Sequence, residues 1–293
     1  MAQRIVIISP VRNEGEYFES TLRSMASQTL RPLLWIIVDD GSTDNTYELA
    51  ASYEKRHSWI RVVRKPDRGA RAVGPGVVEA FNFGLANAGA VESDFICKMD
   101  GDISFDSGYF ETLVAKFEAD PRLGAASGKP FIRVNGRLVP EKTSDEMVAG
   151  QINFYRRECF HAIDGFVPEV HWDGIAFHRA RMEGWRTASF HDEGLRFEHL
   201  RLMGSSDKGI ITGRKRWGKG QYFIGTHPLY LLAITIYRAF ERPFFVGGLF
   251  IGVGYLQAAI RGDRRYEYPG FRQSLRAWQM ERLAIGRRLE RAG

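Results

Sequence analysis

Three short apolar runs dominate the first hundred residues, at positions 4–9, 33–38 and 95–99. Each run has the length of a strand, and an unbroken apolar run predicts a strand that is covered on both of its faces. Helical patterns lie between the runs, for example from about Glu16 to Gln28 and from about Val77 to Ala88. Strands that alternate with helices over short connections predict an α/β fold with a doubly wound, largely parallel sheet.

Composition excludes several classes of protein. The chain has 293 residues, of which 44% are hydrophobic, so it can form one large α/β domain or two smaller ones. The net charge of +6 suits an anionic ligand, an anionic membrane surface or nucleic acid. Nucleic acid has only this charge in its favour, because no platform of interleaved aromatic and basic residues occurs. The two cysteines have no metal-binding or redox spacing, and no apolar leader segment precedes the first run.

Polar side chains follow each of three predicted strands. The segments are Pro10–Glu14, Asp39–Asp40 and Asp100–Asp102. The carboxyl ends of parallel strands meet at one edge of a sheet, which is where open α/β sheets bind ligands. Asp-Gly-Asp by itself is ordinary turn chemistry, but three converging polar segments predict a nucleotide-binding crevice. Two carboxylates at the spacing of Asp100 and Asp102 suit Mg²⁺ or Mn²⁺, with phosphates completing the coordination shell.

The common nucleotide-binding loops are missing from the sequence. No GxxxxGK[ST] phosphate loop occurs, and no GxGxxG follows the first strand. These absences argue against a P-loop enzyme and against a dinucleotide-dependent oxidoreductase. A metal ion that bridges the phosphates would replace such a loop.

The motifs together resemble those of family 2 glycosyltransferases with the A-type fold. Those that carry the resemblance are Pro10-Val11-Arg12-Asn13-Glu14, Val38–Asp44 and Met99-Asp100-Gly101-Asp102, and it covers about residues 4–200. The resemblance implies transfer of a sugar from a nucleotide-sugar donor, usually with inversion and with a divalent metal. A sugar-nucleotide nucleotidyltransferase would need a glycine-rich basic turn after the first strand, which this chain lacks.

The resemblance also assigns donor-binding residues. Pro10, Arg12 and Glu14 would border the base and the ribose. Asp39 matches the acid that reads the edge of a uracil-type base, and Asp40 lies beside it. Arg71 matches a basic residue that faces the nucleotide from the loop after a further predicted strand at residues 60–63.

Three further residues are expected to carry the metal. Asp102 would ligate it, and Asp100 would hold the ribose or a metal-bound water. His199 matches a position that supplies a metal ligand in some relatives, although a lone histidine near apolar residues is often structural.

The resemblance places the catalytic base at Asp173. An inverting transfer needs a base to take the proton of the acceptor hydroxyl. Trp172 stands where an acid often precedes this aspartate, and the alternative interpretation is that Asp173 caps the next helix. The basic segment 204–220 is expected to be a loop that closes over the diphosphate, and its alternatives are a solvated loop or one that meets anionic lipid. Arg214 and Trp217 resemble an acceptor-site element of the family, and with Trp172 they are expected on the acceptor and diphosphate side.

The composition changes after Pro228. Residues 243–260 carry no charge and reach the lower length limit of a membrane-spanning helix, but they include a proline, four glycines and a glutamine. Arginines follow closely. The pattern favours helices that lie in the inner leaflet over a true span. Packing on the catalytic domain or on a second subunit, as in a homo-oligomer, is the third interpretation.

The sequence therefore predicts a catalytic domain at residues 1–225, with a donor half at 1–105 and an acceptor half at 106–225, and a helical segment at 226–293. The predicted protein is a metal-dependent, inverting glycosyltransferase on the cytoplasmic face of the membrane. A UDP-type donor is favoured, and the acceptor is a glycan or a lipid-linked glycan. The alternative is a non-catalytic, membrane-associated subunit that binds sugar nucleotides.

Overall fold

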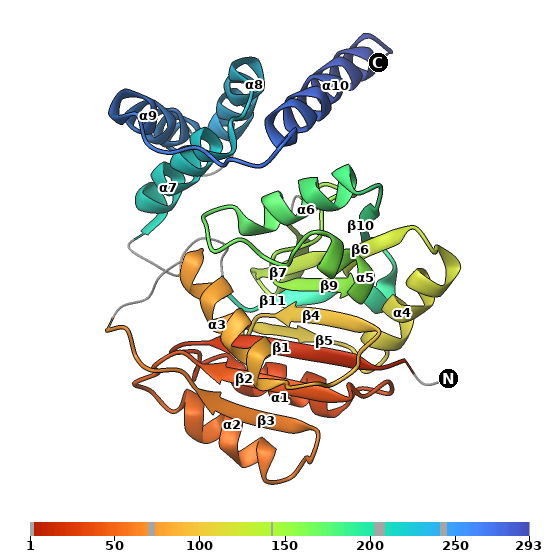
Figure 1. Cartoon of the computed structure of the whole chain (residues 1–293). Coiled ribbons are helices and arrows are strands. Elements are labelled where there is room, and N and C mark those ends of the chain that lie inside the picture. Colours follow the sequence, from red (N-terminus) through yellow and green to blue (C-terminus); the bar gives the residue numbers. More distant parts are fainter. Residues whose placement is uncertain (1–2, 70–73, 142, 202–208, 241–244, 293) are drawn as a thin grey trace. The chain divides into compact units, whose positions relative to one another are not determined.

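The computed structural model describes residues 3–69, 74–141, 143–201, 209–240 and 245–292, with the backbone alone at 210 and 285–292. The chain forms two compact units, Met1–Leu202 and Met203–Gly293. This division comes earlier than the predicted boundary after residue 225, because helix α7 (Gly209–Ile224) packs on helix α9 (Val246–Arg261) of the second unit. Each unit is described below by itself (Figure 1).

The first unit is built on a seven-stranded sheet with the order β10-β6-β9-β4-β1-β2-β3. Six strands run parallel, and β9 is antiparallel to both of its neighbours, β4 and β6. The predicted α/β fold with a largely parallel sheet is confirmed. The strands are β1 (Ile5–Val11), β2 (Leu34–Asp39), β3 (Ile60–Arg64), β4 (Phe95–Met99), β6 (Leu123–Gly128), β9 (Ile152–Arg156) and β10 (Arg186–Phe190).

Helices cover both faces of this sheet, as Figure 1 shows. Alternate side chains of a strand point to opposite faces, and β1 divides its apolar residues accordingly. Ile5 and Ile7 join the core beneath α1, α2 and α4, whereas Val6 and Ile8 join the core beneath α3, α5 and α6. The unbroken apolar runs are thus explained by burial on both sides. The helices are α1 (Phe18–Ala26), α2 (Thr46–Glu54), α3 (Pro75–Asn87), α4 (Tyr109–Ala119), α5 (Arg157–Ala162) and α6 (Trp172–Met182), with a 3-10 turn at Glu193–Leu195.

A smaller four-stranded sheet has the order β5-β11-β7-β8. β5 (Ile103–Phe105) begins directly after Asp102 and pairs antiparallel with β11 (Phe197–His199), so that His199 lies opposite Ile103. The remaining strands are β7 (Pro130–Val134) and β8 (Arg137–Pro140). This sheet brings residues near position 200 beside the Asp100–Asp102 segment.

The second unit consists of helices, and glycines allow them to approach closely. A methyl group at Gly218 of α7 would lie 2.0 Å from the Ile251 carbonyl oxygen of α9, and one at Gly254 of α9 would lie 2.1 Å from the Lys215 oxygen. Segment 204–220 was expected to be a loop, but residues 209–220 are helical, since this packing stabilises a helix there. The other helices are α8 (Pro228–Ala239) and α10 (Phe271–Ala292). Within the described ranges, no helix is both long and apolar enough to cross a bilayer.

Candidate active site

The polar segments that follow β1, β2 and β4 meet at the carboxyl edge of the large sheet. β1 and β2 pair in register to their ends, so that Val11 lies opposite Asp39, and the Asp40 amide donates to the Val11 carbonyl over 2.9 Å. On the other side of β1, Ile8 lies opposite Lys98, two residues before Asp100. The predicted convergence of the three segments is therefore observed.

Asp39 is almost fully buried, with 1% of its surface exposed. Its Oδ1 accepts a hydrogen bond from the Ser42 amide over 3.0 Å, and its Oδ2 accepts one from Arg64 Nε over 3.1 Å. A carboxylate fixed from both sides offers its remaining lone pairs in a defined direction.

Asp40 faces the loop that follows β3. Arg68 Nη2 donates to both of its carboxylate oxygens, over 2.7 and 2.8 Å, and Lys65 Nζ lies 3.4 Å from Oδ1. Arg12 donates to the Asp40 carbonyl and, over 2.8 Å, to Asp67 Oδ1. Sequence reasoning chose Arg71 as the basic residue of this loop, but Arg71 lies outside the described residues. Arg68 was missed, although it stands in the same arginine-rich stretch.

Lys98 is a buried cation inside the apolar strand β4, with 3% of its surface exposed. Its ammonium pairs with Asp100 Oδ1 and donates to the Gly150 carbonyl over 2.8 Å, and it lies 5.2 Å from the centre of the Trp172 ring. Burial raises the pKa of Asp100, Lys98 opposes this increase, and the Asp102 charge adds to it. A lysine within an apolar run was the sequence signal for this contact, because a buried charge requires a partner.

Asp102 has 8% of its surface exposed and contacts two cationic groups. Its Oδ2 lies 3.6 Å from His199 Nε2 and 3.2 Å from Arg201 Nε. Arg201 also pairs with Glu14, the residue predicted to border the base and ribose. Arg201 therefore joins the segment after β1 to the segment after β4, which the sequence did not predict.

His199 lies between two carboxylates. Its Nδ1 is 3.4 Å from Glu141 Oε2 and 3.3 Å from Gln151 Nε2, while its Nε2 faces Asp102. Burial lowers the pKa of His199, but the nearby carboxylates of Asp102 and Glu141 outweigh it and raise that pKa to about 10. Glu141 Oε2 is buried and makes no hydrogen bond.

Proteins often orient a metal-ligating imidazole with a carboxylate on the ring nitrogen that does not bind the metal. Here Glu141 lies by Nδ1 of His199, and Asp102 lies by Nε2. His199 Nε2 and Asp102 therefore fit a divalent cation, with Glu141 as the orienting group. Among the described side chains, however, no three His, Cys, Asp or Glu residues are grouped closely enough to hold a metal ion. Asp100, the third predicted ligand, is paired with Lys98, so phosphate oxygens would have to complete the shell.

Asp173 lies in the first turn of α6, one residue after the helix begins at Trp172. The N-cap is His171, with φ of 68°, and the Asp173 Oδ1 accepts only from the adjacent Gly174 amide, over 2.8 Å, among the interactions that the structure describes. The interpretation of Asp173 as the helix cap is therefore wrong. A methyl group at Gly150 would lie 3.4 Å from Asp173 Oδ2, and Lys98 bonds the Gly150 carbonyl. Gly150 thus lies between Asp173 and the Lys98–Asp100 pair.

Arg214 and Trp217 lie on α7 of the second unit, where the Arg238 guanidinium is 5.3 Å from the centre of the Trp217 ring. Their predicted place beside the diphosphate stays a prediction. Trp172 belongs to the first unit and is buried between Phe166 and Lys98.

The fold is therefore an open α/β sheet with acidic side chains along its carboxyl edge, which is where sheets of this class bind nucleotides. The model of Glycosyl transferase family 2 matches residues 6–183, which is more than half of the chain. The chain belongs to this family, as its motifs predicted.

Comparison with known proteins adds three relatives. Poly-beta-1,6-N-acetyl-D-glucosamine synthase of Staphylococcus aureus (strain COL) is 31% identical over 121 residues, which cover 41% of this chain and 27% of the synthase. The chain thus matches about a quarter of that protein's length. A mannosyltransferase from Pyrobaculum calidifontis, in complex with GDP-Man and Mn²⁺, superposes with a TM-score of 0.57 at 17% identity, covering 99% of this chain and 81% of its own. S. aureus TarS 1–349, in complex with UDP-GlcNAc, has a TM-score of 0.53 at 18% identity, covering 89% and 74%. Both structures support the A-type fold.

Proposed function

We propose that this protein is an inverting glycosyltransferase that moves a sugar from a nucleotide-sugar donor to a glycan or lipid-linked acceptor in polysaccharide or glycolipid synthesis. The observation that carries the proposal is the cluster at the carboxyl edge, where Asp173 meets the Lys98–Asp100 pair across Gly150. A UDP-type donor is favoured, because the synthase is named for an N-acetylglucosamine polymer and TarS was solved with UDP-GlcNAc.

In this proposal the donor lies along the ends of β1, β2 and β4. Asp39 directs its carboxylate at the edge of the base, and Pro10, Arg12 and Glu14 border the base and ribose. Asp40 belongs to the same wall, which Arg68 shares through its bond to Asp40, and Arg71 is the basic residue proposed to face the nucleotide. Asp100 holds the ribose or a metal-bound water.

The predicted Mg²⁺ or Mn²⁺ would be held by Asp102 and His199, with Asp100 as a further ligand. Glu141 would orient the imidazole from behind. When bound, such a cation neutralises charge on the leaving diphosphate. Arg201 and Glu14 are paired beside this position, so donor binding would have to rearrange that pair.

Asp173 is the proposed base. As the acceptor oxygen forms its bond to the anomeric carbon, the bond from that carbon to the diphosphate oxygen breaks, and Asp173 takes the proton of the acceptor hydroxyl. The attack comes from the side opposite the leaving group, which inverts the anomeric configuration.

We place the protein on the cytoplasmic face of a membrane as a peripheral protein. The second unit exposes apolar side chains on α8 and α9, and an apolar face rimmed by arginines suits an anionic lipid surface. The exposed residues are Leu229, Leu232, Ile236, Phe240, Phe245, Leu249, Leu256 and Ile260.

Calorimetric titration with UDP, GDP and dTDP, each with and without Mn²⁺, tests the donor site. We expect one nucleotide to bind with metal, and Asp102→Ala to weaken that binding by roughly a hundredfold or more, since second-shell changes alone cost 10–100-fold. The control is Asp106→Ala, an exposed acid beyond β5. If no nucleotide binds under any condition, the proposal of a donor site is wrong. Nucleotide binding without turnover would favour the non-catalytic subunit.

A further inference from the structure

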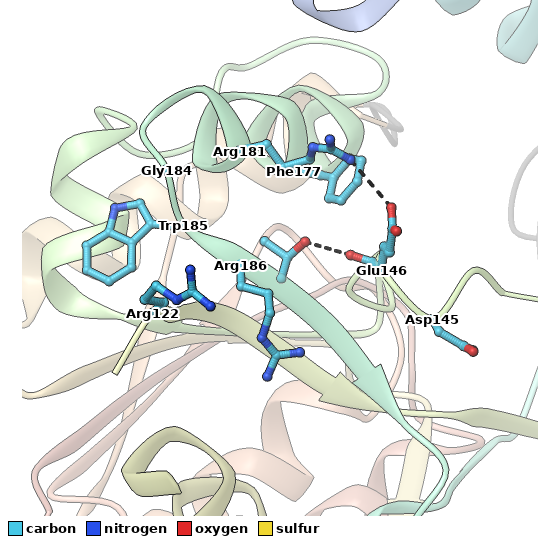
Figure 2. Close-up of a pocket in the computed structure, with 9 residues that line it drawn as sticks. Arg122, Asp145, Glu146, Phe177, Arg181, Gly184, Trp185 and Arg186 are labelled. Carbon is cyan, nitrogen blue, oxygen red and sulfur yellow. Dashed lines mark hydrogen bonds and ion pairs between the residues drawn. The ribbon is translucent and has the colours of Figure 1, made fainter. Parts of the chain in front are cut away.

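The first unit contains a cavity at the outer edge of the large sheet (Figure 2), and its lining includes none of the acids that follow β1, β2 and β4. β10 is the end strand of the sheet, and the C-terminal half of α6 lies beside it. The cavity has a volume of about 570 Å³, within the range of pockets that hold small ligands. It is lined by Arg122, Asp145, Glu146, Phe177, Arg181, Gly184, Trp185, Arg186 and Thr187.

The acids that line this cavity are already neutralised. Asp145 lies 2.7 Å from Lys129 Nζ and 2.9 Å from His191 Nε2, and Glu146 lies 3.4 Å from Arg181 Nη1. Their charges therefore do little to repel an incoming anion.

The arginines leave one cation available. Arg186 Nε bonds to Asp120 Oδ2 over 2.6 Å, and Arg181 pairs with Glu146. The Arg122 guanidinium is exposed and, among the described residues, makes no hydrogen bond or ion pair. A guanidinium presents a planar fork of donors that matches a carboxylate or a phosphate, so Arg122 is a ready partner for such a group.

Two aromatic residues give the cavity an apolar wall. Trp185 packs closely on Gly124 of β6, where an added methyl group would lie only 2.7 Å from the Trp185 Cβ. Phe177 packs beneath the Arg181 guanidinium at 5.6 Å from its ring centre. An indole beside paired charges offers both an apolar face and polar edges, which is what a sugar ring requires.

Helix α6 connects this cavity to the candidate base. Asp173, Phe177 and Arg181 are spaced by four residues and so lie on one face of the helix, over about 12 Å from first to last. Residues 146–150 lie along the same face of α6. Gly150 is close to Asp173 at one end, and Glu146 pairs with Arg181 at the other.

We propose that this cavity is a distal acceptor subsite that binds an anionic sugar unit, one that bears a carboxylate or a phosphate, about 12 Å from the residue that would deprotonate the acceptor hydroxyl. The role as an acceptor site rests on the proposed function. Arg122 holds the anionic group and Trp185 packs on the sugar ring, so that the cavity selects acceptors that carry charge.

Calorimetric titration of the full chain tests this subsite with matched pairs of probes. The first pair is tri-galacturonic acid and maltotriose, and the second is glucose 6-phosphate and glucose. We expect at least one charged probe to bind more tightly than its neutral match, and Arg122→Gln to weaken that charged probe about tenfold, the typical cost of losing a charge-assisted hydrogen bond. The pair that responds identifies carboxylate or phosphate as the group recognised.

Arg31→Gln is the control, because Arg31 is an exposed arginine before β2 and outside the cavity. Both variants should keep the unfolding temperature of the wild type and its nucleotide affinity. Equal affinity for charged and neutral probes, no binding of any probe, or an unchanged affinity in Arg122→Gln would each overturn the subsite. Charge-selective, Arg122-dependent binding in a protein that binds no nucleotide would keep the sugar site and reject its role as an acceptor site, which separates the two proposals.

Discussion

The two units of the chain place polar and apolar groups in opposite ways. In the first unit, ionisable side chains are buried at the sheet edge, among them Asp39, Lys98, Asp102 and His199, and each has a partner of opposite charge. In the second unit, large apolar side chains are exposed, such as Ile260 at 85%. A buried charge costs stability unless it is paired and hydrogen-bonded, whereas a large exposed apolar patch marks a surface that binds a partner or a membrane.

The exposed apolar residues follow helical spacing. On α8 they are Leu229, Leu232 and Ile236, continuing to Phe240, and on α9 Leu249, Leu256 and Ile260 are spaced by seven and four residues. Residues at such spacings share one face of a helix. Elsewhere the helices pack through glycines, as at Gly248, where a methyl group would lie 2.1 Å from the Thr235 oxygen. The helices of the second unit are therefore closely packed on one another but leave a row of apolar side chains exposed to solvent.

The largest expected effect is at the acidic edge of the first unit. Asp173→Asn should lower turnover by about a thousandfold, since a positioned base contributes 10²–10⁴-fold, and should leave nucleotide affinity unchanged. Single-turnover rates and calorimetry measure the two quantities. Asp164→Asn is the control, because Asp164 is exposed and its φ of 53° suits asparagine. Turnover equal to the wild type would remove Asp173 as the base.

The exposed stripe of α8 is tested with lipid vesicles. Replacing Leu232 and Ile236 together by serine should weaken binding to phosphatidylglycerol vesicles roughly thirtyfold, if about 2 kcal/mol of apolar burial is lost. Co-flotation with vesicles measures the change. Leu138→Ser is the control, because Leu138 is a half-exposed apolar residue of the first unit. If both substitutions weaken vesicle binding equally, or if the wild type does not bind vesicles, the apolar stripe of α8 is not a membrane-binding surface.

The interior of the second unit is tested at its closest helix contact. Gly218→Ala should destabilise the packing of α7 on α9 by about 1–3 kcal/mol, because the new methyl group meets backbone and not a movable side chain. Hydrogen exchange of the α7 and α9 amides reports this loss. Gly252→Ala is the matched change, since its methyl group would lie 3.9 Å from Thr235 Cγ2, and it should stabilise α9 slightly. Equal protection in both variants would contradict the close packing.

The smallest effect concerns a buried histidine of the first unit. Burial, together with the nearby Arg181 charge, lowers the pKa of His178 to about 3. Between that value and the ordinary pKa of about 6.5, the unfolded chain binds a proton that the folded chain does not. Stability should therefore fall as the pH decreases below 6.5, by up to about 1.4 kcal/mol per pH unit from this group. Urea unfolding at several pH values should show that the free energy of unfolding decreases less steeply with falling pH in His178→Gln than in the wild type. Identical slopes in the two proteins would contradict the lowered pKa of His178.

Much of the first unit could be read from local sequence, because its signals are local. An apolar run that ends in an acid predicts both a buried strand and the edge where the acid lies, and Asp39, Asp100 and Asp102 were found in this way. The family match from residue 6 to 183 agrees with those motifs. The roles of these residues in donor and metal binding remain predictions.

Other parts of the site depend on residues that are distant in the chain. The grouping of Glu141, His199 and Asp102 arises because β11 pairs with β5, and neither strand carries a signal that names its partner. The sequence suggested Arg71 as the basic residue that faces the nucleotide, and that residue lies outside the described ranges; the pairing of Arg68 with Asp40 was not predicted. Residues 209–220 form a helix because α9 offers a glycine-lined surface, although their own composition favours a loop.

The sequence alone determined the class of fold, the acids of the carboxyl edge and the apolar character of the C-terminal segment, because periodicity and strand ends are properties of neighbouring residues. Only the tertiary structure decided which cation neutralises which acid, where Asp173 lies relative to Lys98, and that Arg122 and Trp185 share a cavity with α6. Those relations depend on how distant segments pack, and packing is a property of shapes and distances that residue types do not specify.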